Sequence, residues 1–170
     1  MKITAQEEYG LRCLLRLARA GDASLTLPEI ADAEGLSVPH VAKLMAVLRQ
    51  AGLVDSVRGR AGGYRLAKAP ENIRLGSLLL TLGEPLFDEA DYCHKHAGIA
   101  ADGVCVNHAG CTIKSLWQTL ELWMRGTLDR ITLGDLIRHE GRVTELLRER
   151  LTAALEAETS GQIPLTMVNG

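Results

Sequence analysis

The sequence predicts a mainly α-helical protein with one small β-hairpin wing, arranged as a winged helix-turn-helix followed by a long dimerisation helix. Two short helical patterns separated by a tight turn lie within residues 26–52. A strand, a glycine-rich turn and a second strand follow at 53–66. A broad apolar stripe of helical period begins near residue 112. The 170 residues, 46% of them hydrophobic, are enough to bury a core.

These patterns divide the chain into four segments. We expect a winged helix-turn-helix domain at 1–83, a cysteine loop at 84–111, dimerisation and carboxyl-terminal helices at 112–158, and a flexible tail at 159–170. No apolar run approaches the ~18 residues that span a bilayer. A soluble, cytoplasmic protein with reduced thiols is therefore expected.

The first helix is predicted to begin after Thr4, because Thr4 and Glu7 form a capping-box pattern, and to run to about Ala20. Glu8 and Cys13 fall at the two borders of its apolar arc. We interpret Cys13 as a small buried side chain, and Glu8 at its simplest as an exposed partner of Arg12 one turn later. The arc itself consists of Leu11, Leu14, Leu15, Leu17 and Ala18.

Two further helices complete a helix-turn-helix pattern. A capping box formed by Thr26 and Glu29 opens the second helix, which ends near Gly35. Ser37 then caps the third helix, and Gly52 stops it. The polar face of the third helix carries Pro39, His40, Lys43, Ala46 and Gln50. A recognition helix presents such early positions to base edges in the major groove, whereas a plain helical hairpin would use them only for solvation.

The next segment favours DNA binding over the plain hairpin. Residues 53–57 and 64–66 alternate as strands around a basic, glycine-rich turn, which is the pattern of a wing. Arg58 and Arg60 can neutralise phosphates or enter a narrow minor groove. Residues 1–70 hold ten Lys/Arg against seven Asp/Glu, a net +3, whereas residues 71–170 hold nine against fourteen, a net −5. The predicted DNA contacts are Ser37, Pro39, His40, Lys43, Arg58, Arg60, Gly62 and Gly63.

Later helices are predicted at 75–82, from Thr112 onward, at 132–137 and at 143–155. The stripe of the long helix contains two tryptophans in a chain with few aromatic residues. Packing within one subunit would satisfy it, but we favour a dimer helix, because a helix-turn-helix usually binds two half-sites. The stripe consists of Leu116, Trp117, Leu120, Trp123, Met124, Leu128 and Ile131.

Cys93, Cys105 and Cys111 follow the spacing C-x11-C-x5-C in a glycine-containing segment, with His94 and His96 beside the first and His108 between the others. Thiolates in such turns suit an iron–sulfur cluster or zinc. No paired C-x2-4-C knuckle is present, which weakens the zinc interpretation. Three unligated thiols in a loop remain the simplest alternative.

Three runs resemble the IscR, NsrR and RirA family of bacterial winged-helix regulators, over roughly residues 1–140. They are MKITAQEEYGLRCLLRLA at the start, GLVDSVRGRAGGYRLAKAPENIRLGSLL at 52–79 and ITLGDLI at 131–137. The cysteine loop lies where that family holds its iron–sulfur cluster. The resemblance implies that Cys93, Cys105 and Cys111 are cluster ligands.

The resemblance also bears on a fourth ligand. IscR-like members use a histidine three residues after the last cysteine, a position held here by Lys114. NsrR-like members use a carboxylate near the start of the first helix of the partner subunit, which corresponds to Glu8, and position 12 holds Arg12 rather than a second, histidine ligand. The first cysteine gap is longer than in the family, so both a 2Fe-2S and a 4Fe-4S cluster fit. The rivals to Glu8 are His94, His96 and His108.

The resulting hypothesis is a homodimeric transcriptional regulator, a repressor, whose operator affinity depends on an iron–sulfur cluster that senses iron, nitric oxide or redox state. One alternative is a regulator switched by zinc or thiol oxidation without iron. Another, of a different class, is an iron–sulfur carrier or electron-transfer protein. An enzyme is not expected, because the chain contains no nucleophile and base pair, phosphate loop or catalytic metal motif.

Overall fold

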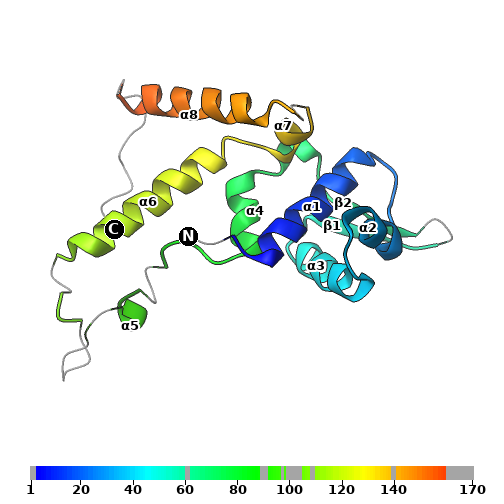
Figure 1. Ribbon diagram of the computed structural model, residues 1–170, viewed down its shortest axis with the longest axis horizontal. Helices are drawn as coiled ribbons and strands as arrows, with labels where there is room; N and C mark the ends of the chain where they lie inside the picture. Colours follow the sequence, from blue (N-terminus) through cyan, green and yellow to red (C-terminus); the bar gives the residue numbers. More distant parts are fainter. Residues whose placement is uncertain are drawn as a thin grey trace.

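The computed structural model of the 170-residue chain describes residues 3–59, 62–88, 92–96, 98, 105–107, 110–138 and 141–159. These residues form helices and one two-stranded β-hairpin, as the sequence predicts (Figure 1). The elements are α1 (Ala5–Arg19), α2 (Leu27–Glu34), α3 (Val38–Gln50), β1 (Val54–Val57), β2 (Gly63–Leu66), the 3-10 turn η1 (Pro70–Asn72), α4 (Leu75–Leu82), α5 (Tyr92–His96), α6 (Thr112–Leu128), α7 (Leu133–Arg138) and α8 (Val143–Thr159).

Local capping sets the beginning of α1 and both ends of α2. Both predicted capping boxes form, Thr4 with Glu7 and Thr26 with Glu29. Gly35 ends α2 with φ +66°, a left-handed conformation that favours glycine. Ser37 occupies the N-cap of α3, as predicted, but its side chain makes no capping hydrogen bond. The apolar faces of α1, α2 and α3 meet in a core that includes Leu14, Leu17, Ile30, Val41, Met45 and Leu48.

The wing is a two-stranded antiparallel hairpin in which Val54 pairs with Leu66 and Val57 with Gly63. Its second strand is also fastened to the segment before α2, because the Leu25 and Tyr64 backbones exchange hydrogen bonds of 2.9 and 2.7 Å. A Cβ atom on Gly63 would lie only 2.5 Å from the Leu25 carbonyl oxygen. Glycine at this position therefore lets the wing dock on the helix-turn-helix.

The chain returns to this domain after α6 through a short antiparallel bridge between Arg74 and Thr132. The Leu75 N–H donates to the Ile131 carbonyl at 2.9 Å, and the Leu133 N–H to the Ile73 carbonyl at 2.8 Å. Ile131 is only 1% exposed. Its assignment to the stripe of the long helix was wrong, because α6 ends at Leu128 and Ile131 packs in the core of the winged domain instead.

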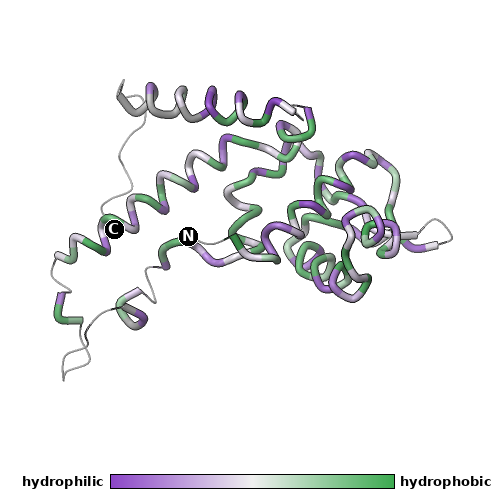
Figure 2. The backbone as a smooth tube through the Cα atoms, in the orientation of Figure 1, coloured by the Kyte–Doolittle hydropathy of each residue, from purple (hydrophilic) through white to green (hydrophobic). Residues whose placement is uncertain are grey.

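Helix α6 extends away from the winged domain, and α8 lies beside it (Figure 1). Hydrophobic residues recur along the length of α6 (Figure 2). Several are exposed rather than packed within the chain, namely Ile113, Leu116, Trp117, Leu120, Leu122 and Trp123. The sequence did not predict α5 or η1, which are five and three residues long. The tail was predicted at 159–170, but Thr159 is the last residue of α8, and residues 160–170 lie outside the described residues.

Across the described ranges, no helix combines the length and the apolar character that crossing a membrane requires.

Candidate functional site

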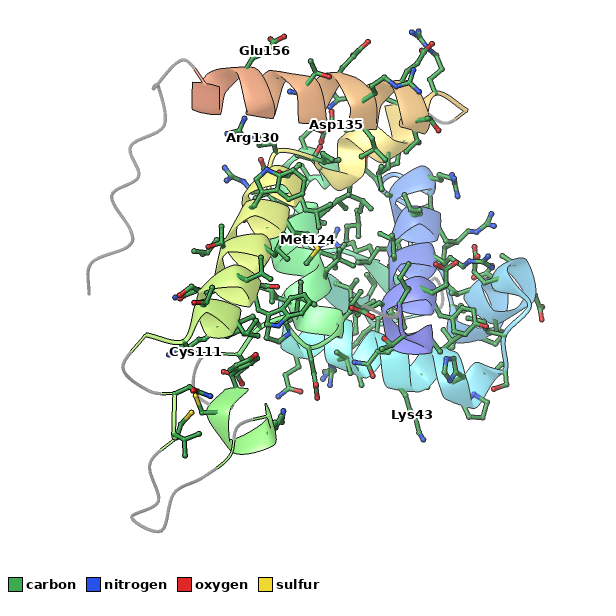
Figure 3. All side chains as sticks on the ribbon, turned by 60° about the vertical axis from the view of Figure 1, so that its left-hand side comes forward. Lys43, Cys111, Met124, Arg130, Asp135 and Glu156 are labelled. Atoms are coloured by element: carbon green, nitrogen blue, oxygen red, sulfur yellow. The ribbon has the colours of Figure 1, made fainter. Side chains whose placement is uncertain are left out.

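The recognition helix α3 presents a polar face at its amino-terminal end. Ser37, Pro39 and Lys43 are all exposed. Lys43 points away from the body of the domain (Figure 3). The opposite face of α3 is held in the core by Val41, Leu44, Met45 and Leu48, so the helix is fixed while these side chains stay accessible. This is the geometry with which a helix enters a major groove.

His40 is placed differently from its neighbours on α3. Its ring packs edge-to-face on the ring of Tyr9 in α1, with centroids 5.6 Å apart, and its Nε2 is buried without a hydrogen-bond partner. The Arg12 guanidinium lies 6.0 Å from the centroid of the same Tyr9 ring, and Arg12 Nε donates to Glu8 Oε1 at 2.9 Å. A continuous row of contacts thus leads from Glu8 on α1 to His40 on the recognition helix.

The wing supplies one exposed cation that the sequence singled out, Arg58. Arg60, its predicted companion, lies outside the described residues. Arg65 on β2 is also exposed and was missed, although its position in the alternating strand marks it as facing outward. Gly62 has a local reason for being glycine, since a Cβ there would lie 2.7 Å from the Gly59 carbonyl oxygen.

The three predicted cysteine ligands lie near the amino-terminal end of α6, where the Cys93 thiol interacts with those of Cys105 and Cys111. Cys111 is the N-cap of α6 (Figure 3). Its Sγ accepts the Lys114 N–H at 3.4 Å. The Sγ of Cys105 accepts the Asn107 N–H at 3.4 Å. Cys93 lies in α5, and its thiol is hydrogen-bonded to that of Cys105. Backbone donors and a helix amino terminus both stabilise negative charge on sulfur.

The thiols influence one another electrostatically. Partial burial raises the pKa of Cys93, and the Cys105 and Cys111 thiols raise it further, while the Lys114 ammonium lowers it. Neighbouring thiolates repel one another, so a cation bound among them would relieve that repulsion. Thiolate sulfur is a donor that soft metal ions prefer, so the chemistry of these side chains, rather than their present arrangement, suits a soft metal.

The predicted fourth ligand is not beside these thiols within one chain. Glu8 is exposed and paired with Arg12. Among the described residues, no group of three or more His, Cys, Asp or Glu side chains is arranged to hold a metal ion. His94 and His96 lie on α5, but their side chains, like all of His108, are outside what the structure describes.

Glu121 is a buried residue that the sequence reasoning missed. It is 5% exposed on α6, accepts the Leu86 N–H at 2.9 Å and forms an ion pair with Arg125. It therefore fastens the segment that leads into the cysteine loop to the same helix that Cys111 begins. Its signal in the sequence is that it is the only acidic residue between Thr112 and Leu128.

A family described as "Rrf2: Iron-dependent Transcriptional regulator" matches residues 3–139. The chain belongs to this family. Its relatives include the "HTH-type transcriptional regulator IscR" of Aliivibrio salmonicida, 33% identical over 138 residues that cover 81% of this chain and 77% of the relative. The corresponding protein of Escherichia coli is 31% identical, covering 82% of each chain.

Solved structures of the Rrf2 type are also similar. "T. potens IscR" has a TM-score of 0.62 at 32% identity, covering 81% of this chain and 87% of that one. CymR, described as the global cysteine regulator of B. subtilis, has a TM-score of 0.62 at 29% identity, covering 82% and 98%. This Rrf2 chain is therefore a DNA-binding transcriptional regulator with a winged helix, and not an enzyme.

Proposed function

We propose that this Rrf2 protein is a cytoplasmic, homodimeric repressor whose operator affinity is controlled by an iron–sulfur cluster, 2Fe-2S or 4Fe-4S, that senses iron, nitric oxide or redox state. The observation that carries the proposal is that the Cys93 thiol interacts with the Cys105 and Cys111 thiols beside the amino terminus of α6. The family description as iron-dependent and the IscR relatives support it.

Three thiolates leave a cluster one ligand short, and we propose Glu8 of a second copy as the fourth. Ile113, Leu116, Trp117, Leu120 and Trp123 recur at helical spacing on α6 and are 38–54% exposed, which is a large apolar surface for a protein in water. A second copy of α6 would cover it and would bring its own α1 to the cysteines. Glu8 is exposed and suitable for this role, because only its surface pair with Arg12 would have to break.

The site residues would act as follows. Cys93, Cys105 and Cys111 would hold the cluster, which when bound supplies a centre whose charge and ligand set change with redox state, nitrosylation or loss of iron. Glu8 bound to it would release Arg12 from the 2.9 Å pair. Arg12 lies over the Tyr9 ring, and Tyr9 contacts His40 on the recognition helix. A movement of Arg12 would therefore alter the packing of Tyr9 against α3.

The DNA contacts are proposed from the exposed face of α3 and from the wing. Ser37, Pro39 and Lys43 would approach base edges. Arg58 and Arg60 would contact the phosphates, and Gly62 and Gly63 would let the hairpin lie close to the DNA backbone. His40 would contribute through its position at the helix end, with one ring face already against Tyr9.

The decisive experiment is purification without oxygen, followed by absorption spectroscopy, iron and sulfide analysis, and binding to DNA selected by the protein from a random library. We expect iron, sulfide and charge-transfer bands, together with an affinity that changes when the cluster is removed. A protein that contains no iron after reconstitution would show that no iron–sulfur cluster is bound. A protein that binds the selected DNA equally with and without the cluster would show that the cluster does not regulate operator affinity.

Glu8→Ala tests the ligand from the partner subunit. We expect a changed spectrum and faster cluster loss, because a carboxylate ligand has been removed. Glu145→Ala is the matched control, since Glu145 is also exposed and ion-paired with an arginine, Arg142 at 2.7 Å, but lies on α8. If Glu8→Ala and Glu145→Ala retained identical cluster spectra and stability, Glu8 would not be a ligand.

A regulator switched by zinc or by thiol oxidation is the second candidate. The likeness to CymR, a cysteine regulator, favours it, as does Lys114 at the position where IscR-like members have a histidine. A colourless protein that contains zinc, or whose DNA affinity changes on mild oxidation with no metal bound, would select this candidate over the cluster.

A further inference from the structure

Helix α4 lies between the helix that begins with the cysteines and the helices that read DNA. It packs against α6 on one side and against α1 and α3 on the other (Figure 1). Its side chains Leu75, Leu78 and Leu82 are buried in the common core. Any change in the orientation of α6 relative to the winged domain must therefore be accommodated at α4.

The amino terminus of α4 is capped by a residue from the end of α6. Arg74 holds the N-cap position but makes no side-chain capping bond. Asp129, at the C-cap of α6, replaces it, because its Oδ1 accepts the Ser77 N–H at 3.0 Å and the Ser77 hydroxyl at 3.2 Å. A Cβ on Gly76 would lie 2.5 Å from the same Oδ1, so the two helices approach as closely as glycine permits.

The other end of α4 is fastened to the beginning of α1. Gln6 Nε2 donates to the Leu82 carbonyl at 2.6 Å, which satisfies one of the carbonyl groups left free at a helix end. A Cβ on Gly10 would lie 2.6 Å from Leu82 Cδ2. The contact is tight at this end too, and it adjoins Glu8 and Tyr9.

We infer that Asp129 and Gln6 are positioning residues that transmit the orientation of α6 to the DNA-reading helices through α4. The inference rests on the proposed function, in which the state of the cysteine loop changes operator affinity. A helix hydrogen-bonded at both ends and closely packed along its length moves as one body, so a displacement at Asp129 reaches α1 and α3. If Asp129 served only as a cap, its loss would destabilise the fold without altering the coupling.

The test is the ratio of DNA affinities between two states of the same protein, purified anaerobically with its metal and then stripped with a chelator. The probe is the duplex that the wild-type protein selects from a random library. A coupling of ordinary size would give the wild type a ratio of roughly 5 to 150. We expect Asp129→Ala and Gln6→Ala each to bring this affinity ratio to within about twofold of one, because each variant would remove the coupling between the cysteine loop and DNA binding.

Two matched variants separate coupling from stability. Asp135→Ala removes an equivalent carboxylate cap, which accepts the Thr132 N–H at 3.0 Å and the Thr132 hydroxyl at 2.8 Å, but its hydrogen bonds stay within α7 and the residue before it and do not reach α4. It should lower the melting temperature like Asp129→Ala while keeping the wild-type ratio. Asp129→Asn retains an oxygen acceptor for Ser77 and should restore most of the ratio.

The double variant Asp129→Ala, Gln6→Ala shows whether the two residues act in series, because its ratio should equal that of either single variant. A wild-type ratio in both single variants, with lowered melting temperatures, would overturn the inference. A ratio near one in the wild type itself would instead overturn the proposed function, and the two failures are thus distinguishable.

Discussion

The winged domain and helix α6 use apolar side chains in opposite ways. In the winged domain, Leu14, Leu17 and Leu48 are fully buried by other parts of the same chain. On α6, Trp117 and Trp123 are 38% and 41% exposed, although tryptophan is a side chain that proteins usually bury. The winged domain buries its apolar side chains within one chain. Helix α6 carries large apolar side chains that the described part of the chain leaves partly exposed.

The cysteines of the two regions also differ in burial. Cys13 is completely buried in the winged domain, and burial, with Glu34 nearby, raises the pKa of its thiol to about 11. Cys93, Cys105 and Cys111 are half-buried and gathered at the free end of α6. One cysteine therefore serves as packing, and the other three are available for ligands or for chemistry.

The largest expected effect is a difference in alkylation rate between these cysteines. With a pKa of about 11, Cys13 is thiolate in only about one molecule in a thousand at pH 8. We expect iodoacetamide to modify Cys111 at least about a hundredfold faster than Cys13 in folded, metal-free protein, since the thiolate is the nucleophile. Mass spectrometry of the tryptic peptides measures both rates. Equal rates before unfolding would show that Cys13 is not a core residue.

The next effect concerns the exposed face of α6. Trp117→Glu places a charge at the centre of the proposed dimer surface, where a tryptophan anchor is typically worth more than about 2 kcal/mol. We expect a monomer by analytical ultracentrifugation and operator affinity lower by about a hundredfold, because one half-site is lost. Leu122→Glu is the control, since Leu122 is 50% exposed but lies about 140° around the helix. Loss of the dimer with the control alone would assign the interface to the opposite face.

The sequence predicted most of the fold because its signals are local. Capping boxes at Thr4 and Thr26, and the glycine at position 35, fix helix ends through residues three or four positions apart. The predicted limits of α4 also agree with the structure, and Gly83 stands at its predicted end. The prediction for Ile131 was wrong because the apolar pattern of helical period continues past Leu128. The helix itself ends at its C-cap Asp129, and the chain then pairs with residues 73–75.

The candidate site could be predicted only where its residues are close in sequence. Cys105 and Cys111 are marked by spacing, and the pair of Glu8 and Arg12 by a single helical turn. Glu121 with Leu86 and Asp129 with Ser77 are 35 and 52 residues apart, and no periodicity reports such contacts. They depend on how α6 packs on α4, which is decided by the whole fold.

A smaller effect tests the reassignment of Ile131 from the dimer helix to the core. Ile131→Val removes one buried methylene and should lower the free energy of unfolding by about 0.5–1.5 kcal/mol without changing the dimer. Ile113→Val is the matched control, because Ile113 is 54% exposed at the start of α6 and should leave monomer stability unchanged. Urea unfolding and ultracentrifugation together decide the matter. A weakened dimer in Ile131→Val would return this residue to the interface.

The smallest effect concerns Asp135 in α7, the helix that packs against α1 and η1 of the winged domain. Partial burial by itself would raise the pKa of this carboxyl. Hydrogen bonds from the Thr132 N–H and hydroxyl, the charge of Arg150 and a hydrogen bond from Arg138 outweigh it and hold the pKa below its usual value. A lowered pKa in the folded state stabilises the protein above the unfolded pKa of about 3.9, and this stabilisation is lost as the pH falls through the folded pKa.

Asp135→Asn should therefore be less stable than the wild type at pH 7, with a difference that shrinks as the pH falls below about 4. Urea unfolding at pH 7 and pH 3 measures this change, and Asp22→Asn, at an exposed position in the turn after α1, is the control. A difference that is the same at both pH values would mean that Asp135 contributes as a neutral hydrogen-bond acceptor. The contribution of the cap at Thr132 would then come from the geometry of its hydrogen bonds rather than from charge.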